Sequence, residues 1–393
     1  SNGAFQAAIA KAQWAYNAAE HEALPGMKAK SALILARAFD AENVIGSALE
    51  YYLHAITVLE SEQDTSLLAE VYVELGDYYE KWELPERTLE YYFKASKLLE
   101  PTQNIDLRIA TLEKVAELNE RFDHLRAAAI HYEKLRSIYA QRGNTEREAC
   151  LYRKMSEIYR DGRMYDEAIR CSKEACMIYH ALGDTAHILQ SLSDIGRVSR
   201  RNNNPTQAAD SLKQYIRLAD LYYRNIANGP AARDYTQNLL MLGSIYEEMA
   251  DKAFLEDYAL AADYYRLALD VTDPGKLPRL YAKALYHTGV MHGKAGRARK
   301  ALRYLDLALF YAKNEQDAEI MTLAQLSKAN ILSDAGKHRE ALAAHREYAA
   351  LKEKQHRQKI DTYRRQYIDI REHEINTQIM AQRESMIREK ERQ

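Results

Sequence analysis

Residues 75–101 read LGDYYEKWELPERTLEYYFKASKLLEP, and this stretch carries the pattern that decides the fold. Gly76 precedes Tyr79 by three residues, and Tyr92 follows the glycine after sixteen, three residues before Ala95. A small residue lets two helices cross closely, and an aromatic ring one turn away fills the space where the helices diverge. The stretch therefore predicts two helices that pack against each other as a pair.

The small residue recurs along most of the chain. Steps of 40 connect the first five copies, steps of 47 and 46 lead to the next two, and a final step of 40 reaches the eighth. We call these eight the anchor residues: Ala36, Gly76, Ala116, Ser156, Gly196, Gly243, Gly289 and Ala329. A second small position follows each anchor, and seven of its eight copies are alanine: Ala48, Thr88, Ala128, Ala168, Ala208, Ala261, Ala301 and Ala341. Because one helical pair cannot cover its own apolar face, the repetition predicts a stack of pairs with a continuous core.

The motif of the repeat runs small–x–x–aromatic, alanine, aromatic, alanine, as in Gly243, Tyr246, Ala261, Tyr265 and Ala268. Over residues 30–350 this order resembles the tetratricopeptide repeat family. The resemblance implies an all-α fold, a right-handed α-α superhelix or solenoid of eight helical pairs over residues 29–350. The match is weaker in the third, fifth and eighth copies, where Asn119 and Ser199 replace the expected aromatic residue and Lys328 replaces the apolar residue before the anchor. Residues 4–24 are expected to be the second helix of a truncated repeat.

Residues 351–393 form a charged tail without Gly or Pro, which predicts one long helix. Ile360, Tyr363, Tyr367 and Ile370 are spaced 3-4-3, and the pattern resumes at Ile375 and Ile379 after a gap of five. The spacing favours a short, imperfect coiled coil and with it a homodimer through the C-terminal helix. The alternative is a single helix that caps the last repeat and ends in solvent.

Composition and local motifs give no sign of chemistry. The net charge of −2 favours no nucleic acid or membrane surface, and no apolar run is long enough to span a bilayer. The segment GVMHGKAG (289–296) lacks the spacing of a phosphate-binding loop, and REHEIN (371–376) lacks the second histidine of a zinc protease. We therefore expect no enzyme, no catalytic residue, no metal and no cofactor. The three cysteines do not suggest a disulfide framework, which favours the cytoplasm, with a periplasmic location open if a signal peptide was removed.

The resemblance also implies where a ligand would bind. In that family the first helix of each pair lines a concave groove, so residues one and four positions after the anchor would point into it. The second and third repeats are acidic at these positions, and the fourth and fifth are mostly basic, so the groove could orient an extended charged peptide. The alternative is that these charges pair with one another and only solvate the inner face. The candidate ligand residues are Asp77, Glu80, Glu117, Glu120, Arg160, Arg197, Arg200 and Arg201.

An array of this period followed by a charged helix resembles the tetratricopeptide arrays of bacterial sensor kinases and LuxR-type regulators. That resemblance implies a protein- or peptide-binding module, the sensory or regulatory part of a bacterial signalling protein, with any output domain beyond Gln393. A scaffold for a multiprotein complex and a peptide-pheromone receptor remain the alternatives.

Overall fold

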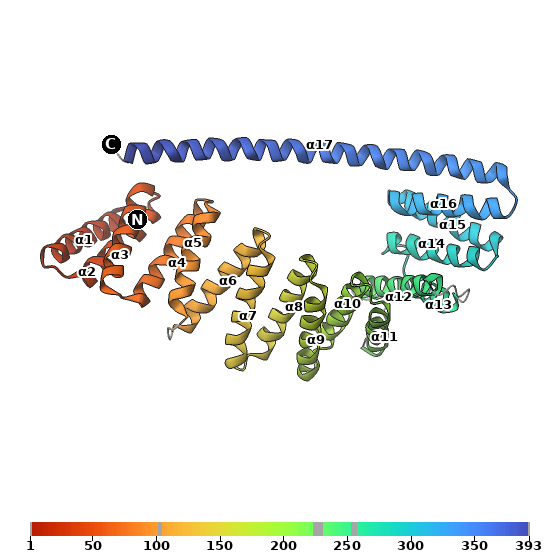
Figure 1. Cartoon of the computed structure of the whole chain (residues 1–393), viewed down its shortest axis with the longest axis horizontal. Helices are drawn as coiled ribbons and strands as arrows, with labels where there is room; N and C mark the ends of the chain where they lie inside the picture. Colours follow the sequence, from red (N-terminus) through yellow and green to blue (C-terminus); the bar gives the residue numbers. More distant parts are fainter. Residues whose placement is uncertain (1, 101–103, 223–230, 253–257, 392–393) are drawn as a thin grey trace. The chain divides into compact units, whose positions relative to one another are not determined.

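The computed structural model describes residues 2–100, 104–222, 231–252 and 258–391, with the side chains of residues 2–8, 45 and 373–391 left aside. These residues form seventeen α-helices and no strand, which confirms the predicted all-α repeat array (Figure 1). The helices are α1 (Asn2–His21), α2 (Pro25–Ala41), α3 (Ile45–Glu62), α4 (Thr65–Lys81), α5 (Pro85–Leu99), α6 (Ile105–Arg121), α7 (Leu125–Gln141), α8 (Thr145–Asp161), α9 (Tyr165–Leu182), α10 (Thr185–Arg201), α11 (Pro205–Tyr222), α12 (Ala232–Lys252), α13 (Ala259–Val271), α14 (Pro278–Lys294), α15 (Ala298–Asn314), α16 (Ala318–Asp334) and α17 (His338–Glu391).

Helix and turn lengths explain the regular step between anchors. Helices α6, α7 and α8 contain 17 residues each, and the short connections 122–124 and 142–144 separate them. One helix with its connection therefore accounts for half of the step, and one helical pair accounts for all of it. Every anchor lies in an even-numbered helix from α2 to α16, and the second small residue lies in the helix that follows.

The connections repeat as regularly as the helices. Asp64, Asn104, Asn144 and Asp184, which recur with the same step as the anchors, cap the N-termini of α4, α6, α8 and α10 by accepting a backbone N–H bond at 3.1 to 3.2 Å. Such caps satisfy backbone donors that have no partner within the helix. Nine of the described connections in the first unit also contain a residue with positive φ, which ends the preceding helix in a left-handed turn. In residues 1–204 these are Ala23, Asn43, Gln63, Glu83, Asp123, Gly143, Arg163, Gly183 and Asn203.

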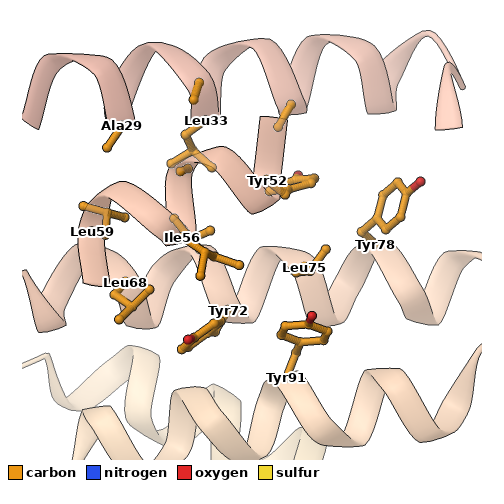
Figure 2. Packing of buried hydrophobic residues seen from close by; sticks show 14 of the residues in the cluster. Ala29, Leu33, Tyr52, Ile56, Leu59, Leu68, Tyr72, Leu75, Tyr78 and Tyr91 are labelled. Carbon is orange, nitrogen blue, oxygen red and sulfur yellow. The ribbon is translucent and has the colours of Figure 1, made fainter. Parts of the chain in front are cut away.

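The chain divides into two compact units, residues 1–204 and 205–393. The boundary falls between α10 and α11, inside the fifth predicted pair. In the first unit, apolar side chains from consecutive helices interlock, as Leu33 of α2, Ile56 of α3 and Leu75 of α4 do in Figure 2. Each pair thus buries the face that its neighbour leaves open.

The anchor positions are points of close helix contact, as the sequence pattern predicted. A Cβ atom placed on Gly76 would lie 2.8 Å from the ring of Tyr92, and one on Gly243 would lie 2.7 Å from the ring of Tyr265. Both distances are too short for a relaxed carbon–carbon contact, so the helices can approach this closely only with glycine.

In the second unit, α17 is a single helix that includes both the second helix of the last pair and the tail. Its first turns pack on α16, where Ala341 and Ala344 meet Ala329 and Leu332. Farther along, the Gln355 amide donates to the carbonyl of Ala318 at 2.7 Å. The predicted border at residue 350 is therefore not a helix end, because the helix that completes the last pair simply continues.

Candidate binding face

The predicted ligand residues lie on the even-numbered helices of the first unit, near their C-terminal ends. We call the exposed and half-buried candidate side chains one and four positions after the anchors of α4, α6, α8 and α10 the charged face, together with Arg201. Asp77 and Glu80 lie on α4, Glu117 and Glu120 on α6, Arg160 on α8, and Arg197, Arg200 and Arg201 on α10.

Side-chain contacts join these helices in series. The Lys114 ammonium of α6 lies 2.7 Å from the Glu80 carboxylate of α4, and Lys154 of α8 lies 2.8 Å from Glu120 of α6. Between α8 and α10 the Arg153 guanidinium donates to the Gln190 side-chain oxygen at 2.6 Å. These contacts place α4, α6, α8 and α10 side by side in series, with Glu80 and Glu120 at the points where neighbouring first helices meet.

Glu80 belongs to a three-part contact between two helical pairs. Besides Lys114, it accepts a hydrogen bond from the Tyr92 hydroxyl at 3.3 Å, and the same hydroxyl donates to Asp77 at 2.5 Å. The hydrogen bond from the Lys114 ammonium holds the pKa of the Glu80 carboxyl below its ordinary value. Burial, and then the hydrogen bond to the Asp77 carboxylate, raise the pKa of Tyr92, so its hydroxyl stays a donor.

The same arrangement recurs at the next repeat and again in the second unit. Glu120 accepts from Tyr132 at 3.2 Å and pairs with Lys154. In the second unit Glu247 accepts from Tyr265 at 2.8 Å and lies 3.1 Å from Lys294. We call this recurring contact the carboxylate ladder: an acid four residues after the anchor, a tyrosine of the second helix and a lysine of the next first helix.

The ladder reverses its charges at the fourth repeat. Arg160 occupies the position of the acid, and Asp194 of α10 occupies the position that Lys114 and Lys154 hold in the earlier repeats. The hydrogen bond to its neighbour Asp161 raises the pKa of the Arg160 guanidinium most, and the charge of Asp194 adds to that rise. Asp194 itself is buried, and Arg197 donates to it at 2.6 Å.

Half of the candidate residues therefore pair with a side chain of opposite charge. Glu80 and Glu120 pair with lysines, Arg160 pairs with Asp161, and Arg197 pairs with Asp194. This arrangement agrees with the alternative reading for these four residues, in which charges of the inner face neutralise one another. The remaining four are Asp77, which accepts only from Tyr92 among the described contacts, and Glu117, Arg200 and Arg201.

Glu117, Arg200 and Arg201 are exposed, and none of them forms a side-chain hydrogen bond or ion pair within the part of the chain that the structure describes. Among the candidate residues, the acidic side chain that remains open thus lies on α6, and the basic ones lie on α10. The change of sign that the sequence suggested persists after the internal pairs are set aside. This surface has the charge pattern for an extended ligand with one basic and one acidic segment.

Sequence reasoning missed the lysines that complete the ladder. Lys114 and Lys154 recur with the same step as the anchors, and each follows its acid, Glu80 or Glu120, at the same distance along the chain. The equal spacing of these two acid–lysine pairs was a usable signal, since a contact that repeats in space must also repeat in sequence.

Other site types find no support in the described side chains. No group of three or more His, Cys, Asp or Glu residues among them is arranged to hold a metal ion. None of the described helices combines the length and the apolar character that crossing a bilayer requires. Cys171 is buried, and burial raises the pKa of its thiol to about 11, which makes it a packing residue rather than a nucleophile.

Comparison with known proteins identifies the fold. No family model matches this sequence, and no curated protein sequence matches it. Among solved structures, the chain resembles a signal transduction ATPase with numerous domains and a tetratricopeptide repeat sensor from Pyrococcus horikoshii, with a TM-score of 0.52 and 13% identity. That match covers 85% of this chain and 51% of the archaeal chain.

Two further solved structures are similar over much of this chain. The apo form of RapI matches with a TM-score of 0.41 and 14% identity, over 74% of this chain and 99% of its own. The C-terminal part of a tetratricopeptide repeat protein from Cytophaga hutchinsonii matches with a TM-score of 0.46 and 14% identity, over 70% and 93%. The match to the archaeal sensor supports the tetratricopeptide repeat fold that the anchor pattern predicted.

Proposed function

We propose that this protein binds a protein or peptide partner through the charged face of its first unit. The observation that carries the proposal is the separation of charge that remains once the ladder is accounted for. Glu117 of α6 and the Arg200–Arg201 pair of α10 are exposed, opposite in sign and located on one stack of helices. Exposed charges of opposite sign on a rigid scaffold steer an extended partner and fix its direction.

The contacts of each arginine decide which variants can test the proposal. Arg197 is a poor test residue because its reversal would leave the buried carboxylate of Asp194 without its cation and damage the fold. Arg200→Glu/Arg201→Glu changes the same patch without breaking a described contact. Arg126→Glu is the matched control, since Arg126 is exposed on the second-helix side, on α7.

The test measures peptide binding by fluorescence anisotropy. One peptide carries a lysine block followed by an aspartate block, and the other has the same composition with alternating charges. We expect the block peptide to bind more tightly to the wild type and about tenfold more weakly to Arg200→Glu/Arg201→Glu, which corresponds to roughly 1.4 kcal/mol. Added salt should weaken the binding because the groups are exposed.

Two results would count against this face. Equal binding of the two peptides would show that the separated charges do not select a ligand. Because Arg126→Glu reverses one charge and the test variant reverses two, a loss of binding free energy in Arg126→Glu of about half the size would show a general charge effect. Circular dichroism of each variant confirms that the helical fold is intact.

The finer proposal is a sensory or regulatory role in a bacterial signalling protein. It is supported by α17, which continues without interruption from the last helical pair and could carry a change in the array to an attached domain. The archaeal protein of similar fold has a tetratricopeptide repeat sensor. A scaffold would hold its partner without a change in the array, and a pheromone receptor would bind a short peptide. Hydrogen exchange of α17 with and without ligand separates a sensor from a scaffold. Exchange that changes on ligand binding supports the sensor role.

A further inference from the structure

The exposed part of α17 carries a row of apolar side chains. Beyond Gln355 every residue up to 372 is exposed. Within this segment Ile360, Tyr363, Tyr367 and Ile370 are 38%, 68%, 63% and 58% exposed. We call these four residues the tail seam. Their 3-4-3 spacing places them on one side of the helix, the pattern of a helix that packs along another helix.

Charges around the tail seam are unevenly distributed. At about 100° per residue, Lys359 and Arg364 lie within roughly 80° of the centre of the seam, on opposite sides of it. On the same count Asp361 and Asp369 lie roughly 140° away, on the reverse of the helix. The seam is therefore a narrow apolar stripe with basic edges.

A second copy of this chain fits these edges poorly. With Ile360 and Tyr367 at position a of a heptad, Lys359 is at position g and Arg364 at position e. In a parallel pair of copies, g of one helix faces the following e of the other, so Lys359 would face an arginine. An antiparallel pair sets e against e and g against g, which again joins like charges.

A lipid surface also fits poorly. Helices that lie in a membrane interface present a wide apolar face, whereas the tail seam is one residue wide per turn. Ile368, the other large apolar residue nearby, is 55% exposed and lies roughly 120° from the centre of the seam. The apolar residues thus do not merge into one broad face.

We propose that the tail seam binds an amphipathic helix of another protein whose apolar stripe is edged by acidic residues. Such a helix would cover the four apolar side chains and place carboxylates beside Lys359 and Arg364. Apolar burial supplies the attraction, and the edge charges select the partner and its register.

The test uses the full chain and two designed helical peptides. Both have Leu and Ile at the core positions; one has Glu and the other Lys at the edge positions. Fluorescence anisotropy should show the Glu peptide binding at least about tenfold more tightly than the Lys peptide, roughly 1.4 kcal/mol. Tyr363→Gln/Tyr367→Gln should abolish binding, and the matched control Ile368→Gln on another side of the helix should leave it unchanged. Lys359→Glu/Arg364→Glu should reverse the preference.

Each of the other outcomes overturns the proposal. Equal binding of both peptides, or of neither, would remove the acidic helix as the partner. Sedimentation of a dimer that Tyr363→Gln/Tyr367→Gln dissociates would assign the seam to a second copy. Binding to phosphatidylserine vesicles that is lost in the same variant, without binding of the Glu peptide, would assign it to lipid.

Discussion

Replacing Gly76 by alanine tests the central claim about how the array packs. The added methyl group would lie 2.8 and 2.9 Å from two ring carbons of Tyr92, which is fully buried. The ring cannot easily move away, because its hydroxyl donates to Asp77 at 2.5 Å. The substitution must therefore either separate α4 from α5 or break that hydrogen bond.

The expected magnitude follows from two opposing effects. Overpacking a close contact costs about 1 to 3 kcal/mol. Replacing glycine in the middle of a helix by alanine returns about 1 kcal/mol of helix preference. Since a shift of the Tyr92 ring also weakens a hydrogen bond to a carboxylate, which is worth about 1.5 to 3 kcal/mol, we expect a net destabilisation of roughly 1 to 3 kcal/mol.

Gly46→Ala is the matched control. Gly46 lies in the first turn of α3, and nothing lies within 4 Å of an added Cβ atom. There the helix preference acts alone, so the variant should gain roughly 0.5 kcal/mol. The same chemical change is thus expected to have opposite signs at the two glycines.

The assay is urea unfolding followed by the fluorescence of Trp82, which directly follows α4 and packs near Tyr78. A Trp14→Phe background leaves Trp82 as the only tryptophan of the chain. A local probe is needed because long repeat arrays do not always unfold in one step. A Gly76→Ala variant as stable as Gly46→Ala would refute the reasoning. The chain contains a precedent for that result, since Ala116 and Tyr132 form the equivalent pair one repeat later.

Three further predictions concern single titrating or reactive groups. Because Lys114 lowers the pKa of Glu80, the stabilisation from Glu80 is complete above the ordinary carboxyl pKa of about 4.5 and is lost as the pH falls below it. Carbon-detected NMR titration should show that the pKa of Glu80 is higher in Lys114→Met than in the wild type. The pair is partly exposed, so the variant should lose less than about 1 kcal/mol of stability at pH 7. Burial lowers the pKa of His131, so as the pH falls this histidine is protonated in the unfolded chain before it is protonated in the folded one, and stability should fall below about pH 6.5. The midpoints of urea unfolding at pH 7.5 and 5.5 should therefore differ less in His131→Leu than in the wild type. Burial also raises the pKa of Cys171 to about 11, so iodoacetamide should modify Cys171 more slowly than Cys150 in the native protein. Mass spectrometry measures the two rates, and equal rates would contradict the burial of Cys171.

The packing of the array could be predicted because it depends on residue size at fixed intervals. Gly76 and Gly243 are small because a tyrosine ring occupies the space of their missing side chains. Even the weaker copies follow from packing: Asn119, where an aromatic residue was expected, is buried and donates to the carbonyl of Val115 at 2.7 Å. A polar residue can replace the ring there because its amide finds a partner within its own helix.

The charged face was predicted less completely, for a reason of geometry. Whether Glu80 is open to a ligand depends on Lys114, which is distant in sequence and belongs to the next repeat but the same stack of first helices. The sequence shows the sign of each residue, but the pairing requires knowing which helix lies beside which. The tail shows the same limit, because its 3-4-3 spacing indicates an apolar stripe without revealing that α17 leaves α16 after Gln355.

The carboxylate ladder divides the charged face into two kinds of position. A ligand cation that takes the place of Lys114 at Glu80, or of Lys154 at Glu120, removes a contact between neighbouring first helices. A ligand that binds Glu117, Arg200 or Arg201 displaces none of the contacts described. A ligand changes the conformation of a protein only if it binds two arrangements of the helices with different affinities. Among the candidate residues, Glu80 and Glu120 are those whose described partners lie on the neighbouring first helix, so a ligand bound there affects the contact between the helices. If the proposed sensor role is correct, the affinity therefore resides mainly in Glu117, Arg200 and Arg201, and the response in Glu80 and Glu120.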